Sequence, residues 1–160
     1  KQFFESHNVP GLERARFPVA DRTGASMVVE YGQGKTQFIT SDTWHLISTN
    51  FIMSDIKNEN YPCWRYIAAD KLLSGADELD LALIRKVLKE TSQEGRALTV
   101  YSNIYDLKKG IIYLYNMRNF DEAVVMDLAE EMGKGQRQID LKSLFESTGD
   151  KPALSQKPLK

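Results

Sequence analysis

Residues 99–116 read TVYSNIYDLKKGIIYLYN, and this stretch decides the fold class of the chain. Two runs rich in β-branched and aromatic residues flank the short segment DLKKG at 106–110. Such runs are typical of β-strands. A glycine at the end of a short connecting loop suits a type I turn followed by a bulge. The stretch therefore predicts an antiparallel hairpin that closes at Gly110.

A second antiparallel group is predicted nearer the N-terminus. Residues 16–40 read RFPVADRTGASMVVEYGQGKTQFIT, in which DRTG and YGQGK supply two turns. Between the turns, Val28 and Glu30 alternate with their apolar neighbours, which is the period of a strand with two different faces. Further strands are expected at WHLISTNF, residues 44–51, and at EAVVMDL, residues 122–128.

Two helices are predicted between these groups. The first starts near Pro62, which suits the first helical position with Asn60 as a nearby cap, and it ends before Gly75. The second starts near Asp77 or Asp80. Apolar stripes mark one face of each helix, and they consist of Ile67, Leu72 and Leu73 in the first and Leu81, Ile84, Val87 and Leu88 in the second.

These elements together predict an α+β fold dominated by antiparallel strands. Residues 1–12 are expected to form an extended lead-in, because they contain Pro10 and Gly11 and show no clear period. Residues 13–147 are expected to form a single α+β domain that ends in a short helix, DLKSLFES. Residues 148–160 have no core-forming pattern, so a mobile tail is predicted there.

The composition argues against several classes of protein. Lys and Arg number 21 against 22 Asp and Glu, so no excess of positive charge is present to bind nucleic acid. No apolar run approaches the ~20 residues that span a bilayer, and no signal peptide is apparent. The single cysteine fits a reducing compartment. We therefore expect a cytoplasmic protein without a membrane partner. Because the chain begins with Lys1, we also expect a processed product or a piece of a longer protein.

Two features of the sequence, a glycine-rich segment and a pair of histidines, are considered as phosphate or metal sites and have ordinary explanations. GQGKT at 32–36 resembles the end of a phosphate-binding loop, but Val29 stands where that loop needs a glycine. A strand also follows where the loop needs a helix, so a hairpin turn is favoured. His7 and His45 lie far apart in the sequence and have no flanking acidic or cysteine ligands. No metal or cofactor is therefore expected.

Cys63 and Asn50 have side chains suited to catalysis, and each has a plainer alternative. Cys63 lies at a predicted helix start, two residues before Arg65, and both features favour a thiolate. A nucleophile also needs a base within reach, and a free cysteine is often simply buried. Asn50 ends an apolar strand, where its NH₂ group could stabilise an oxyanion. Spacing alone favours an asparagine that starts a turn.

Five segments occur in an order that resembles one protein family. VADRTGASMVVEY contains the spacing D-x-x-G-x-x-x-V-x-E, STNF contains a Thr-Asn pair at a strand end, and WRY contains an arginine followed by an aromatic residue. TVYSNIYDLKKGIIYLY matches T-x-x-S-x-x-Y-D-x-x-x-x-x-x-Y, and MDLAEEMGKG precedes LKSLF. Over residues 15–147, the chain thus resembles the linear amide C–N hydrolases, the choloylglycine hydrolase and penicillin V acylase group.

The resemblance implies an N-terminal-nucleophile hydrolase with an αββα sandwich. In that family, a cysteine exposed by processing attacks an amide, and its own α-amino group acts as the base. An α-amine has a reference pKa near ~8, so it can act at neutral pH without a histidine. Asn50 matches the oxyanion-stabilising asparagine and Arg65 the active-site arginine, while Phe51 belongs to loops expected to line the acyl pocket. Cys63 does not match the family's cysteine.

The leading expectation is the C-terminal part of a cysteine-type amide hydrolase or acyltransferase that acts on a small-molecule amide. Its nucleophile would come from an upstream segment or a separate chain. The alternative is a non-catalytic α+β module that binds a ligand or partner. A sheet lacking its upstream strands would expose an edge, so a homo-oligomer or a partner chain is also expected. We expect Asn50 and Arg65 to approach one concavity. Cys63, about 200° from Arg65 around the helix, should face the opposite way into packing.

Overall fold

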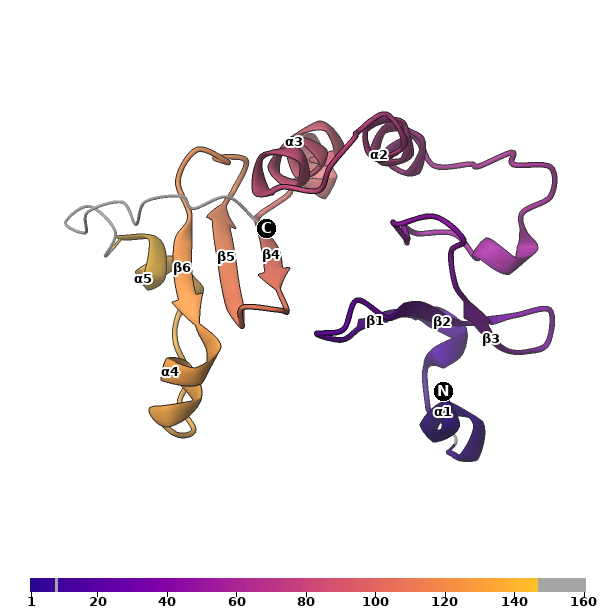
Figure 1. Cartoon of the computed structure of the whole chain (residues 1–160), viewed down its shortest axis with the longest axis horizontal. Helices are drawn as coiled ribbons and strands as arrows, with labels where there is room; N and C mark the ends of the chain where they lie inside the picture. Colours follow the sequence, from indigo (N-terminus) through magenta and orange to yellow (C-terminus); the bar gives the residue numbers. More distant parts are fainter. Residues whose placement is uncertain (8, 147–160) are drawn as a thin grey trace. The chain divides into compact units, whose positions relative to one another are not determined.

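A computed structural model describes residues 1–7 and 9–146 and has an α+β fold with two three-stranded antiparallel sheets (Figure 1). The predicted α+β class is therefore confirmed. The chain divides after Gly75 into two compact units, each with one sheet. The single domain over 13–147 stays a prediction, and the tail predicted at 148–160 lies outside the described residues. Within the described ranges, no helix has the length and apolar character needed to cross a bilayer.

The sheet of the first unit is a three-stranded meander. Its strands, in spatial order, are β1 (Arg16–Ala20), β2 (Ser26–Gly32) and β3 (Lys35–Ile39). Val29 in the central strand pairs with Phe17 on one side and Phe38 on the other. Asp21 fixes the first turn, because its carboxylate accepts hydrogen bonds from the N–H (2.7 Å) and the hydroxyl (2.5 Å) of Thr23. The predicted meander is confirmed.

Both faces of β2 are buried within the first unit. Val28 is 1% exposed and Val29 is 0% exposed, although successive strand residues point to opposite faces. On the Val29 face, the ring of Phe4 lies 6.2 Å from the ring of Phe17. On the Val28 face, the one-turn 3₁₀ helix η2 (Met53–Asp55) is hydrogen-bonded to the strand. The sheet is therefore a middle layer between the N-terminal residues and the segment that contains η2.

The N-terminal residues are helical, so the extended lead-in predicted for residues 1–12 is wrong. Gln2–Ser6 forms α1, and Leu12–Arg14 forms the 3₁₀ helix η1. The rings of Phe3 and His7 stack 4.5 Å apart at a spacing of four residues, which favours a helical turn. Leu12 is buried. These contacts outweigh the loop signals in the sequence.

Residues 44–51 form no strand, which corrects the strand predicted for WHLISTNF. Two of its β-formers, Thr49 and Phe51, contact a later helix and its N-cap instead of joining a sheet ladder. That helix, α2, spans Trp64–Ser74. Cys63 is its N-cap, so Pro62 lies just before the helix rather than at its first position. The predicted end before Gly75 is confirmed.

The second unit contains the predicted hairpin. Helix α3 (Leu81–Thr91) begins where the Asp80 carboxylate accepts a hydrogen bond of 2.6 Å from the Leu83 N–H. The elements that follow are η3 (Gly95–Ala97), β4 (Tyr101–Asp106), β5 (Ile111–Asn116) and β6 (Val124–Asp127). Gly110 has φ 71°, and its N–H donates to the Asp106 carbonyl at 2.8 Å. Strand β5 pairs with both β4 and β6.

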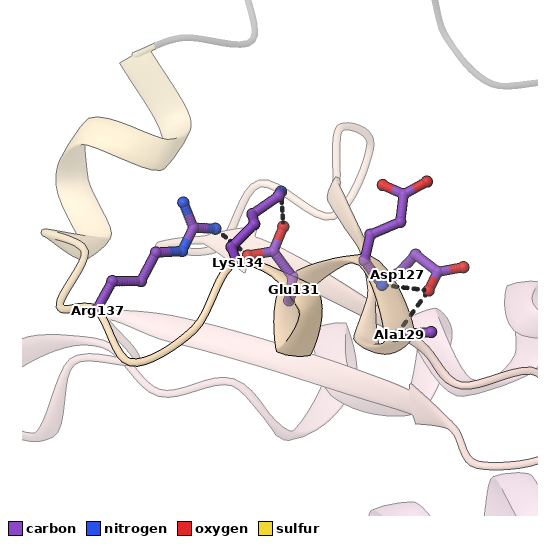
Figure 2. Close-up of polar contacts among 6 residues, drawn as sticks. Asp127, Ala129, Glu131, Lys134 and Arg137 are labelled. Atoms are coloured by element: carbon purple, nitrogen blue, oxygen red, sulfur yellow. Dashed lines mark hydrogen bonds and ion pairs between the residues drawn. The ribbon is translucent and has the colours of Figure 1, made fainter.

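Acidic side chains organise the helix that follows β6. Helix α4 (Leu128–Gly133) is capped by Asp127, whose Oδ1 accepts from the Ala129 N–H at 2.8 Å and the Glu130 N–H at 3.2 Å. Figure 2 shows the Glu131 carboxylate between the side chains of Lys134 and Arg137, which both pair with it. The acidic run thus forms the cap and the first turn of this helix. The short C-terminal helix α5 spans Leu141–Glu146.

Replacing Asp127 by alanine should loosen α4. Two N–H groups of the first turn lose their acceptor, so the free energy of opening this helix should fall by about 1 kcal/mol. Amide hydrogen exchange at Ala129 and Glu130 measures the change. Asp121→Ala is the matched control, because it removes a carboxylate from a nearby exposed loop. Equal exchange in the two variants would contradict the capping role of Asp127.

Candidate functional site

The segment that carries Asn50 packs along helix α2. Its side-chain contacts with the helix and its N-cap are His45 with Asp70, Thr49 with Cys63, and Phe51 with Tyr66. His45 Nε2 lies 3.1 Å from the Asp70 carboxylate in the second half of the helix. Residues 49–51 therefore lie beside the helix start.

Asn50 is exposed at the end of this segment, while the residues on either side of it contact α2. Arg65 lies in the first turn of the helix and is half-buried. The side chains of Arg65 and Thr49 lie near the thiol of Cys63, and both favour its ionised form. The structure thus brings the segment around Asn50 and the turn around Arg65 together at Cys63. A shared hollow for Asn50 and Arg65 stays a prediction.

The predicted orientation of Cys63 is partly wrong. Cys63 is 8% exposed, as expected for a packed residue, but its thiol interacts with Arg65 rather than facing away from it. The rotation of 100° per residue does not apply, because Cys63 is the N-cap with extended backbone angles, φ −117° and ψ 115°. Burial disfavours the thiolate. The Thr49 and Arg65 side chains and the Tyr66 and Arg65 backbone favour the thiolate and outweigh burial, so the pKa of Cys63 lies below its usual value.

Neither histidine can act as the base for Cys63 in this geometry. His45 is bound to Asp70, seven residues along from Cys63, which corresponds to about 10 Å of helix. The side chain of His45 is only 9% exposed, and its Nδ1 has no hydrogen-bond partner among the described residues. His7 belongs to the N-terminal turn, where its Nδ1 lies 2.9 Å from the Ser6 hydroxyl. A Cys–His catalytic pair is therefore absent from the described part of the chain.

Phe51 packs in an aromatic cluster with Tyr61 and Tyr66. Its ring lies 6.1 Å from Tyr61 and 5.4 Å from Tyr66, and the two tyrosine rings stack at 4.2 Å. Burial, together with the hydrogen bond to Tyr61, raises the pKa of Tyr66 far above its usual value, so Tyr66 stays a neutral phenol. Phe51 itself is half-buried. The cluster fixes one side of the Asn50 segment.

The other side of the segment is anchored to the sheet by residues that the sequence analysis did not assign to the site. Glu30 is 0% exposed, and its carboxylate accepts from the N–H groups of Met53 (3.0 Å) and Ser54 (2.7 Å). Arg16 Nε donates to the Thr49 carbonyl at 3.1 Å. Glu30 is the last residue of the family-like spacing D-x-x-G-x-x-x-V-x-E, and this is the one sequence feature that points to it. A polar residue in an alternating strand is ordinarily exposed to solvent, so the burial of Glu30 was not predicted.

A pocket of about 460 Å³ lies in the first unit away from Asn50. Its walls come from both the N-terminal residues and the sheet, and they consist of His7, Val9, Leu12, Glu13, Tyr31 and Thr36. Asn50, Phe51 and Arg65 do not line this pocket. Among residues 1–7 and 9–146, no three His, Cys, Asp or Glu side chains are grouped to hold a metal ion.

In comparisons with known proteins, no family profile, curated protein or solved structure matches this chain. Any functional assignment therefore rests on the residues and their geometry.

The effect of Thr49 on the pKa of Cys63 can be tested by titration. Thr49→Val keeps the shape of the side chain but removes the hydroxyl that favours the thiolate, so the pKa of Cys63 should rise. The ultraviolet absorbance of the thiolate should then appear at higher pH than in the unchanged protein. Because the chain has one cysteine, the signal belongs to Cys63. The control is Thr40→Val, an exposed position. An unchanged or lower titration midpoint in Thr49→Val would contradict the assignment.

Proposed function

We propose that this chain is the C-terminal part of a cysteine-type N-terminal-nucleophile hydrolase that cleaves a linear, non-peptide amide C–N bond. The observation that carries the proposal is the contact between residues 49–51 and the start of α2. STNF and WRY, two of the family-like segments, lie apart in the sequence and meet there. Their meeting is what the resemblance to the choloylglycine hydrolase and penicillin V acylase group requires of Asn50 and Arg65.

In this proposal, Asn50 stabilises the oxyanion and Arg65 favours the thiolate of the attacking cysteine. Thiolate attack on the amide carbon makes a tetrahedral centre with a negative oxygen, and a neutral NH₂ donor suits that charge. The α-amine of the nucleophile takes the thiol proton and passes it to the leaving nitrogen. The C–N bond then breaks and leaves a thioester. Water completes hydrolysis, whereas an amine in its place would give an acyltransferase.

The attacking cysteine comes, in this proposal, from polypeptide outside residues 1–160. Cys63 is poorly suited to the role, because it is buried beside Thr49 and Arg65. It also has no histidine within the ~3 Å that direct proton transfer needs. The partner is therefore an upstream segment or a separate chain, and the substrate is a small-molecule amide.

The two sheets support the αββα sandwich as the finer architecture of the proposal. Strand β2 is buried on both faces. In β5, Tyr115 is buried, and its neighbour Leu114, which points to the opposite face, is half-buried. Apolar residues on both faces are typical of a sheet that lies between two layers.

A second candidate is a non-catalytic α+β module that binds a ligand or a partner. The pocket beside His7 and Glu13 favours it, because small-molecule sites are concave and combine apolar walls with a few polar groups. Either candidate could act as a homo-oligomer. Assays of amide cleavage distinguish the two.

The 160-residue chain alone should not hydrolyse amides, whereas the product of the complete reading frame should. Suitable substrates are penicillin V, bile-salt conjugates and N-acyl homoserine lactones, with product release as the measurement. In the complete protein, Asn50→Ala should lower kcat by roughly 10²–10³, because the oxyanion loses a donor. The matched control is Asn60→Ala in the following exposed loop, which should leave kcat unchanged.

Three outcomes would contradict this proposal. Turnover by the isolated chain that Cys63→Ala abolishes would make Cys63 the nucleophile. Equal kcat values for Asn50→Ala and Asn60→Ala would remove Asn50 from the reaction. Failure of the complete protein to cleave any amide would leave the binding module as the better assignment.

A further inference from the structure

We propose that Glu30 is a positioning residue of the candidate site. Together with Arg16, it holds the segment Thr49–Ser54 on the sheet and thereby sets the position of Asn50. The catalytic consequence rests on the proposed function of Asn50. The anchoring itself rests only on the contacts of this chain and can be tested without any activity.

The two anchoring residues form one cross-strand pair. Arg16 in β1 and Glu30 in β2 are register partners, so their side chains lie on the same face of the sheet. The arginine presents a donor, which binds the Thr49 carbonyl at 3.1 Å. The glutamate presents two acceptors, Oε2 for the Met53 N–H at 3.0 Å and Oε1 for the Ser54 N–H at 2.7 Å. One pair of residues therefore anchors the segment at both ends.

The spacing of these anchors leaves little freedom to the residues between them. Thr49 is held through its carbonyl and Met53 through its N–H, so only residues 50–52 connect the two fixed points. A short connection with fixed ends has few accessible backbone conformations. Within the described residues, no hydrogen bond from the Asn50 side chain fixes it. Its position therefore depends on the anchors and on its packed neighbours.

The burial of Glu30 makes the anchor specific for a carboxylate side chain. Both carboxylate oxygens are used, and the side chain is fully buried. A buried carboxylate is costly unless its acceptors are satisfied, and bonds from backbone N–H groups to a charged acceptor are short and strong. A neutral glutamine would leave one of the two N–H groups without an acceptor, and a shorter side chain could lose both hydrogen bonds. The sheet and the segment are therefore matched to a carboxylate at this position.

The end of strand β2 is also shaped to receive the segment. A Cβ atom on Gly32 would overlap Ser54 Oγ and lie 2.9 Å from Ile52 Cγ2, so glycine leaves room for these two side chains beside the strand. The Gln33 side chain donates to the Ser54 carbonyl at 2.6 Å. Gly32 thus offers a second way to displace the segment, by steric overlap and without a change in charge.

The anchor is tested on the 160-residue chain with Glu30→Gln, which keeps the shape but replaces one acceptor oxygen with a donor NH₂. We expect amide hydrogen exchange at Met53 or Ser54 to become at least about tenfold faster, as for the loss of one buried hydrogen bond. The NMR signals of the Asn50 side-chain NH₂ should shift as well. Glu13→Gln, at an exposed residue, is the control for lost charge and should change neither.

If Glu30→Gln does not fold, two variants at Gly32 test whether the position of the segment sets the position of Asn50. Gly32→Ala should move the same Asn50 signals, and adding Ser54→Gly should partly restore them by removing the overlapping hydroxyl. In the complete protein, Glu30→Gln should lower kcat by about tenfold or more with little change in KM, since misplacement of a catalytic group acts on the transition state.

The outcomes separate this proposal from the proposed function. Unchanged exchange at Met53 and Ser54 in Glu30→Gln, or faster exchange with unmoved Asn50 signals, would overturn the positioning role. If the Asn50 side-chain signals do not shift in Gly32→Ala, the positioning role is overturned as well. If the unchanged complete protein cleaves no amide while Glu30→Gln still releases the segment, the anchor stands and the proposed function fails.

Discussion

The hydrogen bonds from two backbone N–H groups to the buried Glu30 carboxylate link the parts of the first unit that carry the candidate site. They attach the Thr49–Ser54 segment to one face of the sheet. The opposite side of that segment packs on α2 through Thr49 and Phe51. The thiol of Cys63, the N-cap of α2, in turn lies near the Arg65 side chain. Strand, segment and helix therefore form one continuous series of contacts that begins at a single charged residue.

Elements with strong local signals could be predicted from the sequence. The hairpin around Gly110 has β-formers on both sides of a loop that needs positive φ, and the structure has φ 71° there. The ends of the helices follow local chemistry too, with Gly75 after α2 and the Asp80 carboxylate at the start of α3. Residues 44–51 form no strand, because Thr49 and Phe51 contact a helix and its N-cap that follow later in the chain. A local sequence pattern cannot predict such a contact between residues that lie far apart in the chain.

The site was predictable only in part. Asn50 and Arg65 came from a resemblance, and the contacts of their neighbours are compatible with it. The orientation of Cys63 was missed, because the helix starts two residues later than predicted and Cys63 therefore has a capping conformation instead of helical geometry. Glu30 was missed for another reason. A polar residue in an alternating strand ordinarily faces water, and only the folded backbone of Met53 and Ser54 reveals why a charge is buried there.

Both ends of the segment are held through main-chain atoms, namely the Thr49 carbonyl and the N–H groups of Met53 and Ser54. Such recognition is indifferent to most side chains along the segment. Its sequence can therefore diverge during evolution while the path of the backbone is retained, except where Ile52 and Ser54 meet Gly32. For protein engineering, the same property makes the segment a graft site, at which libraries of residues next to Asn50 can be exchanged on an unchanged scaffold.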